Sequence, residues 1–142
     1  MTMGDVDILR RSRDLKHILE YDWLSDVLVA LKPGQLNYSV LLKRIQADAP
    51  FDPWSGRKAV IQPRSLARTL QRMVDNGLIV RHEVERTFPR SVSYELTRAG
   101  DDLLAELSAL AGWAVRHDEV IAEARTRYRQ RRGLVDDGSE AC

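Results

Sequence analysis

The sequence predicts a mainly α-helical protein with a small β-hairpin, folded as a single domain over residues 1–132. Three observations support this fold class. Apolar residues recur at steps of three and four along most of the chain, a short stretch alternates apolar and polar residues, and glycine or proline separates these segments. The length of 142 residues leaves little room for a second domain. Residues 133–142 are polar and are expected to form a flexible tail.

The N-terminal half is expected to contain two helices and a long loop. Apolar residues at helical spacing predict one continuous helix over residues 6–31, which a Pro-Gly pair ends. A second helix is expected to begin at Asn37 or Ser39, either of which is a suitable N-cap, and to end near Gln46. Residues 46–60 are rich in turn formers and are therefore predicted to be an inserted loop.

A third helix and a hairpin are expected next. The helix is predicted over residues 63–76, because a proline suits its first turn and an Asn-Gly pair suits its C-terminal end. Residues 78–85 and 91–97 read as two strands, and the turn between them contains a proline. Together the two strands predict a β-hairpin.

Long helices are expected to follow the hairpin. Thr97 is placed to cap a helix that begins at Arg98 and continues to about Arg131, with a bend near Gly112. The predicted order is therefore helix, helix, loop, helix, hairpin and long helices. This is the plan of a winged helix-turn-helix domain. Residues 36–98 would form its reading head, and the N- and C-terminal helices would flank the head as dimerisation helices.

Charge is distributed unevenly along the chain, although the formal net charge is only +1. Residues 37–98 carry 11 basic and 6 acidic side chains, whereas residues 1–36 carry 5 and 6, and residues 99–142 carry 6 and 9. A basic centre between acidic flanks favours a surface that neutralises DNA phosphates. Chance unevenness is the alternative interpretation.

The helix predicted over residues 63–76 has an outward face that suits a DNA major groove. Burying Leu66, Leu70 and Met73 turns three arginines and two hydroxyl groups outward. Arginine pairs bidentately with guanine, and hydroxyl and amide groups reach base edges or phosphates. An ordinary solvated helix face is the alternative, although this face has no acidic residue before Asp75. The candidate DNA-binding residues here are Gln62, Arg64, Ser65, Arg68, Thr69 and Arg72.

Two further segments supply candidate DNA contacts. Arg86 and Arg90 flank the tip of the predicted hairpin, from which a wing can reach the minor groove or its phosphates. A plain surface turn is the alternative. The inserted loop supplies Arg57 and Lys58 as candidate phosphate contacts. It also contains two aromatic residues, which either cover a ligand pocket or anchor the loop.

A run of residues at matched spacing carries a resemblance to a known family. The run comprises Ile61, Leu66, Leu70, Gly77, Leu78, Arg81, Pro89, Val92, Tyr94, Leu96, Thr97 and Gly100. It resembles the HxlR-type winged helix-turn-helix transcriptional regulators, which are related to the MarR and PadR groups. The resemblance covers roughly residues 23–113 and implies a homodimer that binds operator DNA and regulates transcription. Two departures are the insertion before the third helix and the lack of a sensing cysteine near the first helix.

The flanking helices carry more apolar residues than a small reading head can cover. An intertwined homodimer would bury the excess and would read a near-palindromic site on double-stranded DNA. A monomer whose terminal helices fold back on one another is the alternative. The residues concerned are Ile8, Leu15, Leu19, Leu104, Leu107, Leu110, Trp113, Val120 and Ile121. Residues 125–132 alternate arginine with other residues, which indicates a solvated helix end or, alternatively, a contact with DNA phosphates or RNA.

Other function classes find no support in the sequence. No apolar run is long enough to span a membrane and the N-terminus has no apolar signal core, so a cytoplasmic protein is expected. Cys142 is the single cysteine, and the three histidines lack metal-ligand spacing. No phosphate-binding loop or nucleophile elbow occurs. We therefore expect no enzyme, metal or cofactor.

The sequence thus predicts a homodimeric, sequence-specific DNA-binding transcriptional regulator of bacterial type, with repression as the favoured mode. The alternative from another class is a winged-helix module repurposed to bind a small molecule or a protein partner. A small-molecule effector stays open, because aromatic residues at a dimer junction can line a pocket but more often belong to a core.

Overall fold

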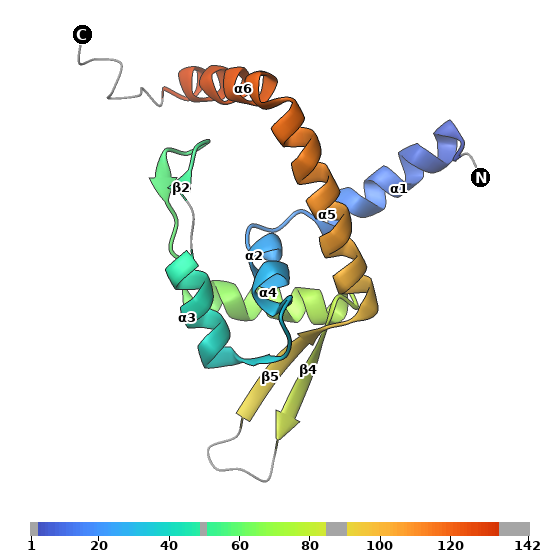
Figure 1. Ribbon diagram of the computed structural model, residues 1–142, viewed down its shortest axis with the longest axis vertical. Coiled ribbons are helices and arrows are strands. Elements are labelled where there is room, and N and C mark those ends of the chain that lie inside the picture. Colours follow the sequence, from blue (N-terminus) through green and yellow to red (C-terminus); the bar gives the residue numbers. More distant parts are fainter. Residues whose placement is uncertain (1–2, 49–50, 85–90, 134–142) are drawn as a thin grey trace.

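A computed structural model describes residues 3–48, 51–84 and 91–133 (Figure 1). It contains six helices and five short strands within these ranges. In chain order the elements are α1 Asp5–Ile18, α2 Leu24–Leu31, β1 Leu36–Asn37, α3 Tyr38–Asp48, β2 Phe51–Asp52, β3 Arg57–Lys58, α4 Pro63–Asp75, β4 Ile79–Val84, β5 Ser91–Leu96, α5 Arg98–Arg116 and α6 Asp118–Arg131. The predicted fold class is confirmed, because the helices, hairpin and flanking helices occur in the expected order.

The hydrophobic core lies between α2, α3, α4 and the root of the β4–β5 hairpin. Apolar residues at helical spacing on the three helices meet there, because each helix must bury its apolar stripe against another element. The largest fully buried side chains are Leu28, Leu31, Leu41, Ile61, Leu66, Leu70, Met73, Ile79 and Val27. This core holds the reading head together and fixes the direction in which α4 faces.

The hairpin belongs to a three-stranded antiparallel sheet of order β1-β5-β4. Leu36 pairs with Tyr94 in the β1–β5 register, and Val84 pairs with Ser91 at the far end of the β4–β5 pair. The two-residue strand β1 was not predicted, because so short a stretch carries no alternating pattern. It joins the start of α3 to the sheet.

The predicted continuous helix over residues 6–31 is wrong. Helix α1 ends at Ile18, and a turn leads to α2 at Leu24. The turn residues Leu19, Tyr21 and Trp23 pack against the core from this bend, where a continuous helix would have carried some of them away from it. The break lets α2 bury one face in the core while α1 projects outward, and no residue of α1 is buried.

The bend in the C-terminal helices lies at His117, five residues beyond the expected position at Gly112. Its φ and ψ of −116° and 35° end α5, and Asp118 begins α6. Gly112 stays inside α5, because a helix tolerates an interior glycine at a modest cost. The predicted cap is confirmed, since the Thr97 hydroxyl accepts a hydrogen bond from the Gly100 N–H at 3.1 Å.

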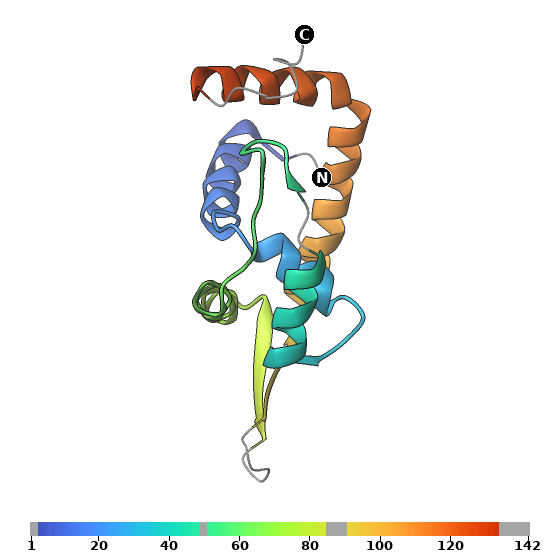
Figure 2. The ribbon, with the colours of Figure 1, turned by 90° about the vertical axis from the view of Figure 1, so that its left-hand side faces the viewer.

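The insertion is more ordered than the predicted loop over residues 46–60. Helix α3 continues to Asp48, and the two-stranded hairpin β2–β3 follows, with Phe51 paired to Lys58. Figures 1 and 2 both show this hairpin on the side of α6 and the β4–β5 hairpin at the opposite end of the molecule. The insertion therefore connects the reading head with the C-terminal arm.

Candidate nucleic-acid interface

Helix α4 presents the cationic surface that the sequence predicts. Pro63 occupies its first turn, and Gln62 is extended at the N-cap with φ −90° and ψ 150°. Leu66, Leu70 and Met73 are buried, which orients the opposite face to solvent. Gln62, Arg64, Arg68 and Arg72 are exposed, and Ser65 is half-buried.

Thr69 was predicted on the outward face, and this prediction is wrong. Its side chain is only 5% exposed. The inward stripe of α4 takes in both Thr69 and Leu70, because positions three and four residues from Leu66 lie on the same helix face. The buried face of α4 is therefore wider than the three apolar residues that were used to orient the helix. Because Thr69 lies on this buried face, it is no longer a candidate DNA contact.

Arg72 differs from the other two arginines in its surroundings. Its guanidinium lies 4.3 Å from the ring centroid of Tyr21, in the turn between α1 and α2. Asn76 Nδ2 also donates a hydrogen bond to the Tyr21 hydroxyl, at 3.4 Å. Arg72 is therefore held at the C-terminal end of α4 by a cation–π contact, while Arg64 and Arg68 lie nearer its N-terminal end.

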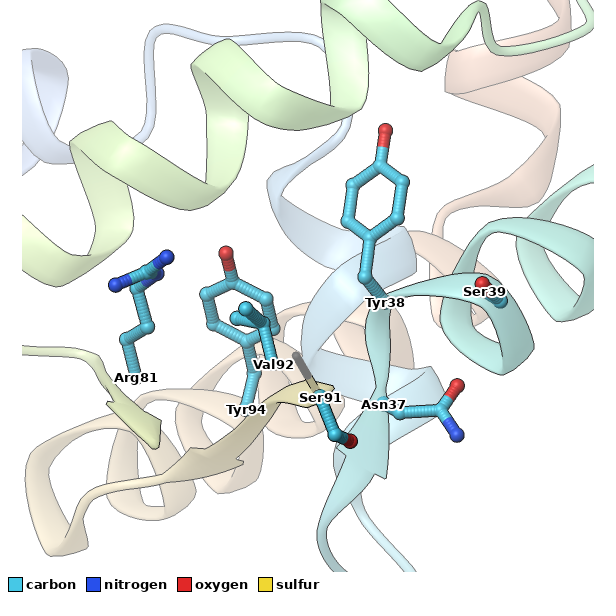
Figure 3. A pocket seen from close by; sticks show the side chains of 7 residues that line it. All are labelled: Asn37, Tyr38, Ser39, Arg81, Ser91, Val92 and Tyr94. Atoms are coloured by element: carbon cyan, nitrogen blue, oxygen red, sulfur yellow. The ribbon is translucent and has the colours of Figure 1, made fainter. Parts of the chain in front are cut away.

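A hollow of about 440 Å³ lies between α3 and the β4–β5 strands (Figure 3). Figure 3 shows the side chains of Tyr38, Tyr94 and Arg81 pointing to the same side, toward α4. The Tyr38 hydroxyl donates a hydrogen bond to the Pro63 carbonyl oxygen at 3.0 Å, which joins the starts of α3 and α4. The full lining is Asn37, Tyr38, Ser39, Arg81, Ser91, Val92 and Tyr94.

One arginine and its acidic neighbour supply the charges at this hollow. A hydrogen bond with Tyr94 raises the pKa of Arg81 above its ordinary value, and nearby Glu83, whose Oε2 lies 3.3 Å from Nη1 of Arg81, adds to the effect. Burial raises the pKa of Tyr38, with a smaller contribution from Tyr94. Arg81 is thus charged and paired with Glu83, so a phosphate oxygen bound beside the Tyr38 and Tyr94 hydroxyl groups would share the guanidinium with that carboxylate.

Sequence reasoning missed this hollow as a candidate site. Tyr38 and Arg81 are 43 residues apart in the sequence, and only the fold brings them together. One signal was available: Arg81 is a cation on the strand that follows α4, in register with Tyr94 of the paired strand. Side chains at such paired positions lie on the same face of a sheet.

The remaining candidates fall on the two hairpins. Arg57 and Lys58 are exposed on β3. Arg86 and Arg90 lie outside the described residues. The strands that lead to them are joined by a His82–Glu95 pair, whose Nε2 and Oε1 atoms are 2.7 Å apart. The described part of the wing is thus a two-stranded stalk with a cross-strand polar pair.

No helix among residues 3–48, 51–84 and 91–133 has the length and apolar character that crossing a bilayer requires. Within the same ranges, no group of three or more His, Cys, Asp or Glu side chains could hold a metal ion.

The family model of the HxlR-like helix-turn-helix matches residues 18–121, which is most of the chain. The protein belongs to the HxlR-like helix-turn-helix family. This HxlR-like chain is 33% identical over 111 residues to an "Uncharacterized HTH-type transcriptional regulator" of Methanothermobacter thermautotrophicus, which covers 78% of this chain and 74% of the relative. The resemblance seen in the sequence is therefore confirmed.

Solved structures support the winged-helix fold of this HxlR-like protein. A MarR-family regulator structure from Enterococcus faecalis V583 matches with a TM-score of 0.60 and 23% identity, covering 89% of this chain and 96% of that one. The reduced form of the transcriptional regulator YodB from B. subtilis matches with a TM-score of 0.55 and 21% identity, covering 80% and 92%. At these identities the matches establish the fold.

Proposed function

We propose that the protein is a homodimeric, sequence-specific DNA-binding transcriptional repressor whose reading element is α4. Membership of the HxlR-like family makes it a helix-turn-helix transcription regulator. The proposal adds the dimer, the sequence preference and the sign of regulation. The observation that carries it is the exposed face of α4, where Arg64 and Arg68 lie with Gln62 and Ser65.

Each part of this surface has a separate role in the proposed complex. Arg64 and Arg68 enter the major groove, where a guanidinium pairs with O6 and N7 of guanine. Arg72, held over Tyr21, contacts the DNA backbone at the other end of α4. The hollow beside Tyr38 and Arg81 receives a phosphate and sets the register of the helix in the groove.

The outer contacts come from the two hairpins. In the proposed complex Arg86 and Arg90 reach the neighbouring minor groove from the wing. Arg57 and Lys58 extend the phosphate contacts from the inserted hairpin, which leads directly into α4. Wing and insertion would then lie on either side of the reading helix along the DNA.

Fluorescence anisotropy tests the proposed sequence preference. The protein is titrated against labelled duplex DNA from the region upstream of its own gene, and against a random duplex of equal length. A specific regulator should prefer its operator by about 1,000-fold or more at physiological salt. Equal affinity for the two duplexes would contradict the proposed sequence preference. A reporter gene placed behind the same region shows whether the protein represses or activates transcription.

The salt dependence of binding tests the inserted hairpin. Replacing Arg57 and Lys58 together with alanine should flatten the plot of log affinity against log salt by up to about 1.8, because two phosphate contacts are lost. Operator preference should stay unchanged, since phosphates carry no base sequence. The matched control is Lys16→Ala with Arg13→Ala on α1. A double variant with the wild-type slope removes both residues from the DNA surface.

Exposed apolar side chains support the proposed homodimer. Leu19, Leu104 and Leu107 pack against the core of their own chain. By contrast, the outer parts of α1, α5 and α6 leave a large apolar surface uncovered in the single chain, with Val115 75% exposed. The exposed residues are Val6, Ile8, Leu9, Leu15, Leu110, Trp113, Val115 and Val120. A two-fold dimer formed through these helices would bury them.

Analytical ultracentrifugation tests the dimer with Leu110→Glu. Wild type should sediment as a dimer at micromolar concentration, and this substitution should raise the dimer Kd at least about thirtyfold, since it buries an unpaired charge. Val40→Glu is the control, because Val40 is similarly apolar and exposed but lies on α3. A monomeric wild type, or equal effects of both variants, would contradict this assembly.

A further inference from the structure

A second hollow, of about 480 Å³, lies between the inserted β2–β3 hairpin and α6. Figures 1 and 2 show the hairpin on the side of α6, apart from the β4–β5 wing. The residues that line the hollow are Trp54, Ala124, Arg127, Tyr128, Arg131 and Arg132. It thus combines two aromatic rings with three guanidinium groups, and it is separate from the outward face of α4.

The two aromatic rings form an open apolar wall. The ring centroids of Trp54 and Tyr128 are 5.5 Å apart, with an interplanar angle of 78°. Each residue is still 38% exposed, although each contacts the other. An edge-to-face pair leaves ring surface uncovered, and a planar group can stack on that surface.

Hydrogen bonding within the hairpin turn holds the backbone of Trp54 before any ligand arrives. Asp52 Oδ1 accepts a hydrogen bond from the Trp54 N–H at 3.0 Å, and this bond is the main reason that the pKa of Asp52 is lowered. Gly56 has a φ of +73°, and a Cβ there would lie 3.0 Å from Nη2 of Arg129 on α6. The turn is therefore fixed close to α6, which lowers the entropy cost of binding.

The positive charge of the hollow exceeds what its own residues neutralise. Arg127 and Arg131 are four residues apart on one face of α6, and the Arg132 guanidinium lies 5.0 Å from the centroid of Tyr128. Arg127 forms an exposed ion pair with Glu123 at 3.2 Å, but none of the lining residues is acidic. Three arginines that line one hollow suit an anion with several charges, above all a phosphate chain.

We propose that this hollow binds a free nucleotide. The base stacks on Trp54, with the Tyr128 ring bordering it, and the phosphates pair with Arg127 and Arg131. The aromatic side chains suit the base of a nucleotide, and the neighbouring arginines suit its phosphates. The volume of the hollow is in the range of small-molecule sites. The site uses no residue of α4, so it does not depend on the proposed DNA contact.

Isothermal titration calorimetry of the full chain without magnesium separates the two halves of the ligand. ADP is the probe, adenosine tests the ring alone, and pyrophosphate tests the charge alone. ADP should bind with a Kd below about 1 mM, and each half should bind at least about tenfold more weakly. Absence of ADP binding, or pyrophosphate binding as tightly as ADP, would overturn the proposal.

Substitutions locate the binding in the hollow. Arg131→Gln and Trp54→Ala should each weaken ADP binding by about tenfold or more, because the first removes a charged phosphate contact and the second removes the stacking ring. Arg116→Gln on α5 is the matched control and should bind ADP like wild type. Circular dichroism confirms that each variant is folded. Equal losses in Arg131→Gln and Arg116→Gln would refute the site.

A short single-stranded oligothymidylate distinguishes a free nucleotide from a nucleic-acid chain. It should bind more weakly than ADP, and its binding should not depend on Trp54. Tighter binding of the oligonucleotide, lost in both Arg131→Gln and Trp54→Ala, would make this surface a single-strand binding site and would overturn the assignment to a free nucleotide.

Discussion

Replacing Arg64 and Arg68 together with alanine should lower operator affinity by about 2–6 kcal/mol, since each lost base pairing costs about 1–3 kcal/mol. Both side chains are exposed near the N-terminal end of α4, where the helix of a winged helix-turn-helix domain meets the base edges. Affinity for random duplex should fall much less. Fluorescence anisotropy with operator and random DNA at one salt concentration measures both changes.

The lysine variant of the same pair is the sharper control. Arg64→Lys with Arg68→Lys keeps both positive charges but loses the planar fork that pairs with guanine. Operator preference should fall almost as far as in the alanine variant, while the salt slope should stay close to that of wild type. If the lysine variant keeps full preference, these residues act on phosphates alone, and base reading by Arg64 and Arg68 is refuted.

Gly100→Ala should destabilise the fold by about 2–4 kcal/mol and lower Tm by roughly 10 °C. Gly100 is buried in the first turn of α5, and a Cβ there would lie 2.1 Å from the backbone carbonyl oxygen of Leu78. Backbone atoms cannot rotate away as a side chain can, so α5 would have to separate from the root of β4. Thermal unfolding followed by circular dichroism measures the loss.

Gly112→Ala provides the matched control within the same helix. A Cβ at Gly112 would meet only Nη1 of the Arg116 side chain, at 3.5 Å. Replacing an interior helix glycine with alanine there should stabilise the protein by up to about 1 kcal/mol. The two substitutions should therefore shift Tm in opposite directions. A Gly100→Ala variant as stable as wild type would contradict the close approach of α5 and Leu78.

Local sequence signals predicted the ends of α4 and the start of α5 well. Pro63 begins α4, Gly77 with φ +74° follows its end, and Thr97 caps α5. Each signal acts through the backbone of its immediate neighbours, so it can be read without knowing the tertiary structure.

Features that depend on distant partners could not be read in this way. The turn before Leu24 and the strand β1 exist because their residues pack against or pair with segments far along the chain. Apolar spacing continues through the turn, so it gave no sign of the break between α1 and α2. The inserted hairpin likewise depends on packing against α6, which contributes Tyr128.

The candidate DNA surface was predictable to the extent that helix periodicity defines it. Three apolar residues oriented α4 correctly and placed Arg64 and Arg68 outward. Thr69 was misassigned because a small side chain can belong to the buried stripe without being apolar. The hollow at Tyr38 and Arg81 could not be predicted from helix periodicity, because residues of helix α3 and of the strands line it together.

The hydroxyl of Thr97 joins two helices at one point. It accepts the Gly100 N–H at 3.1 Å and donates to the Gly77 carbonyl oxygen at 2.7 Å, which ties the end of α4 to the start of α5. Helix α5 has 19 residues and therefore acts as a lever arm of about 28 Å. If α5 tilted by about 10° about the end that is far from α4, α4 would move by about 5 Å. This displacement is larger than one base-pair step of DNA. In the proposed dimer, small changes of angle between the two arms would bring the two reading helices into or out of phase with successive major grooves.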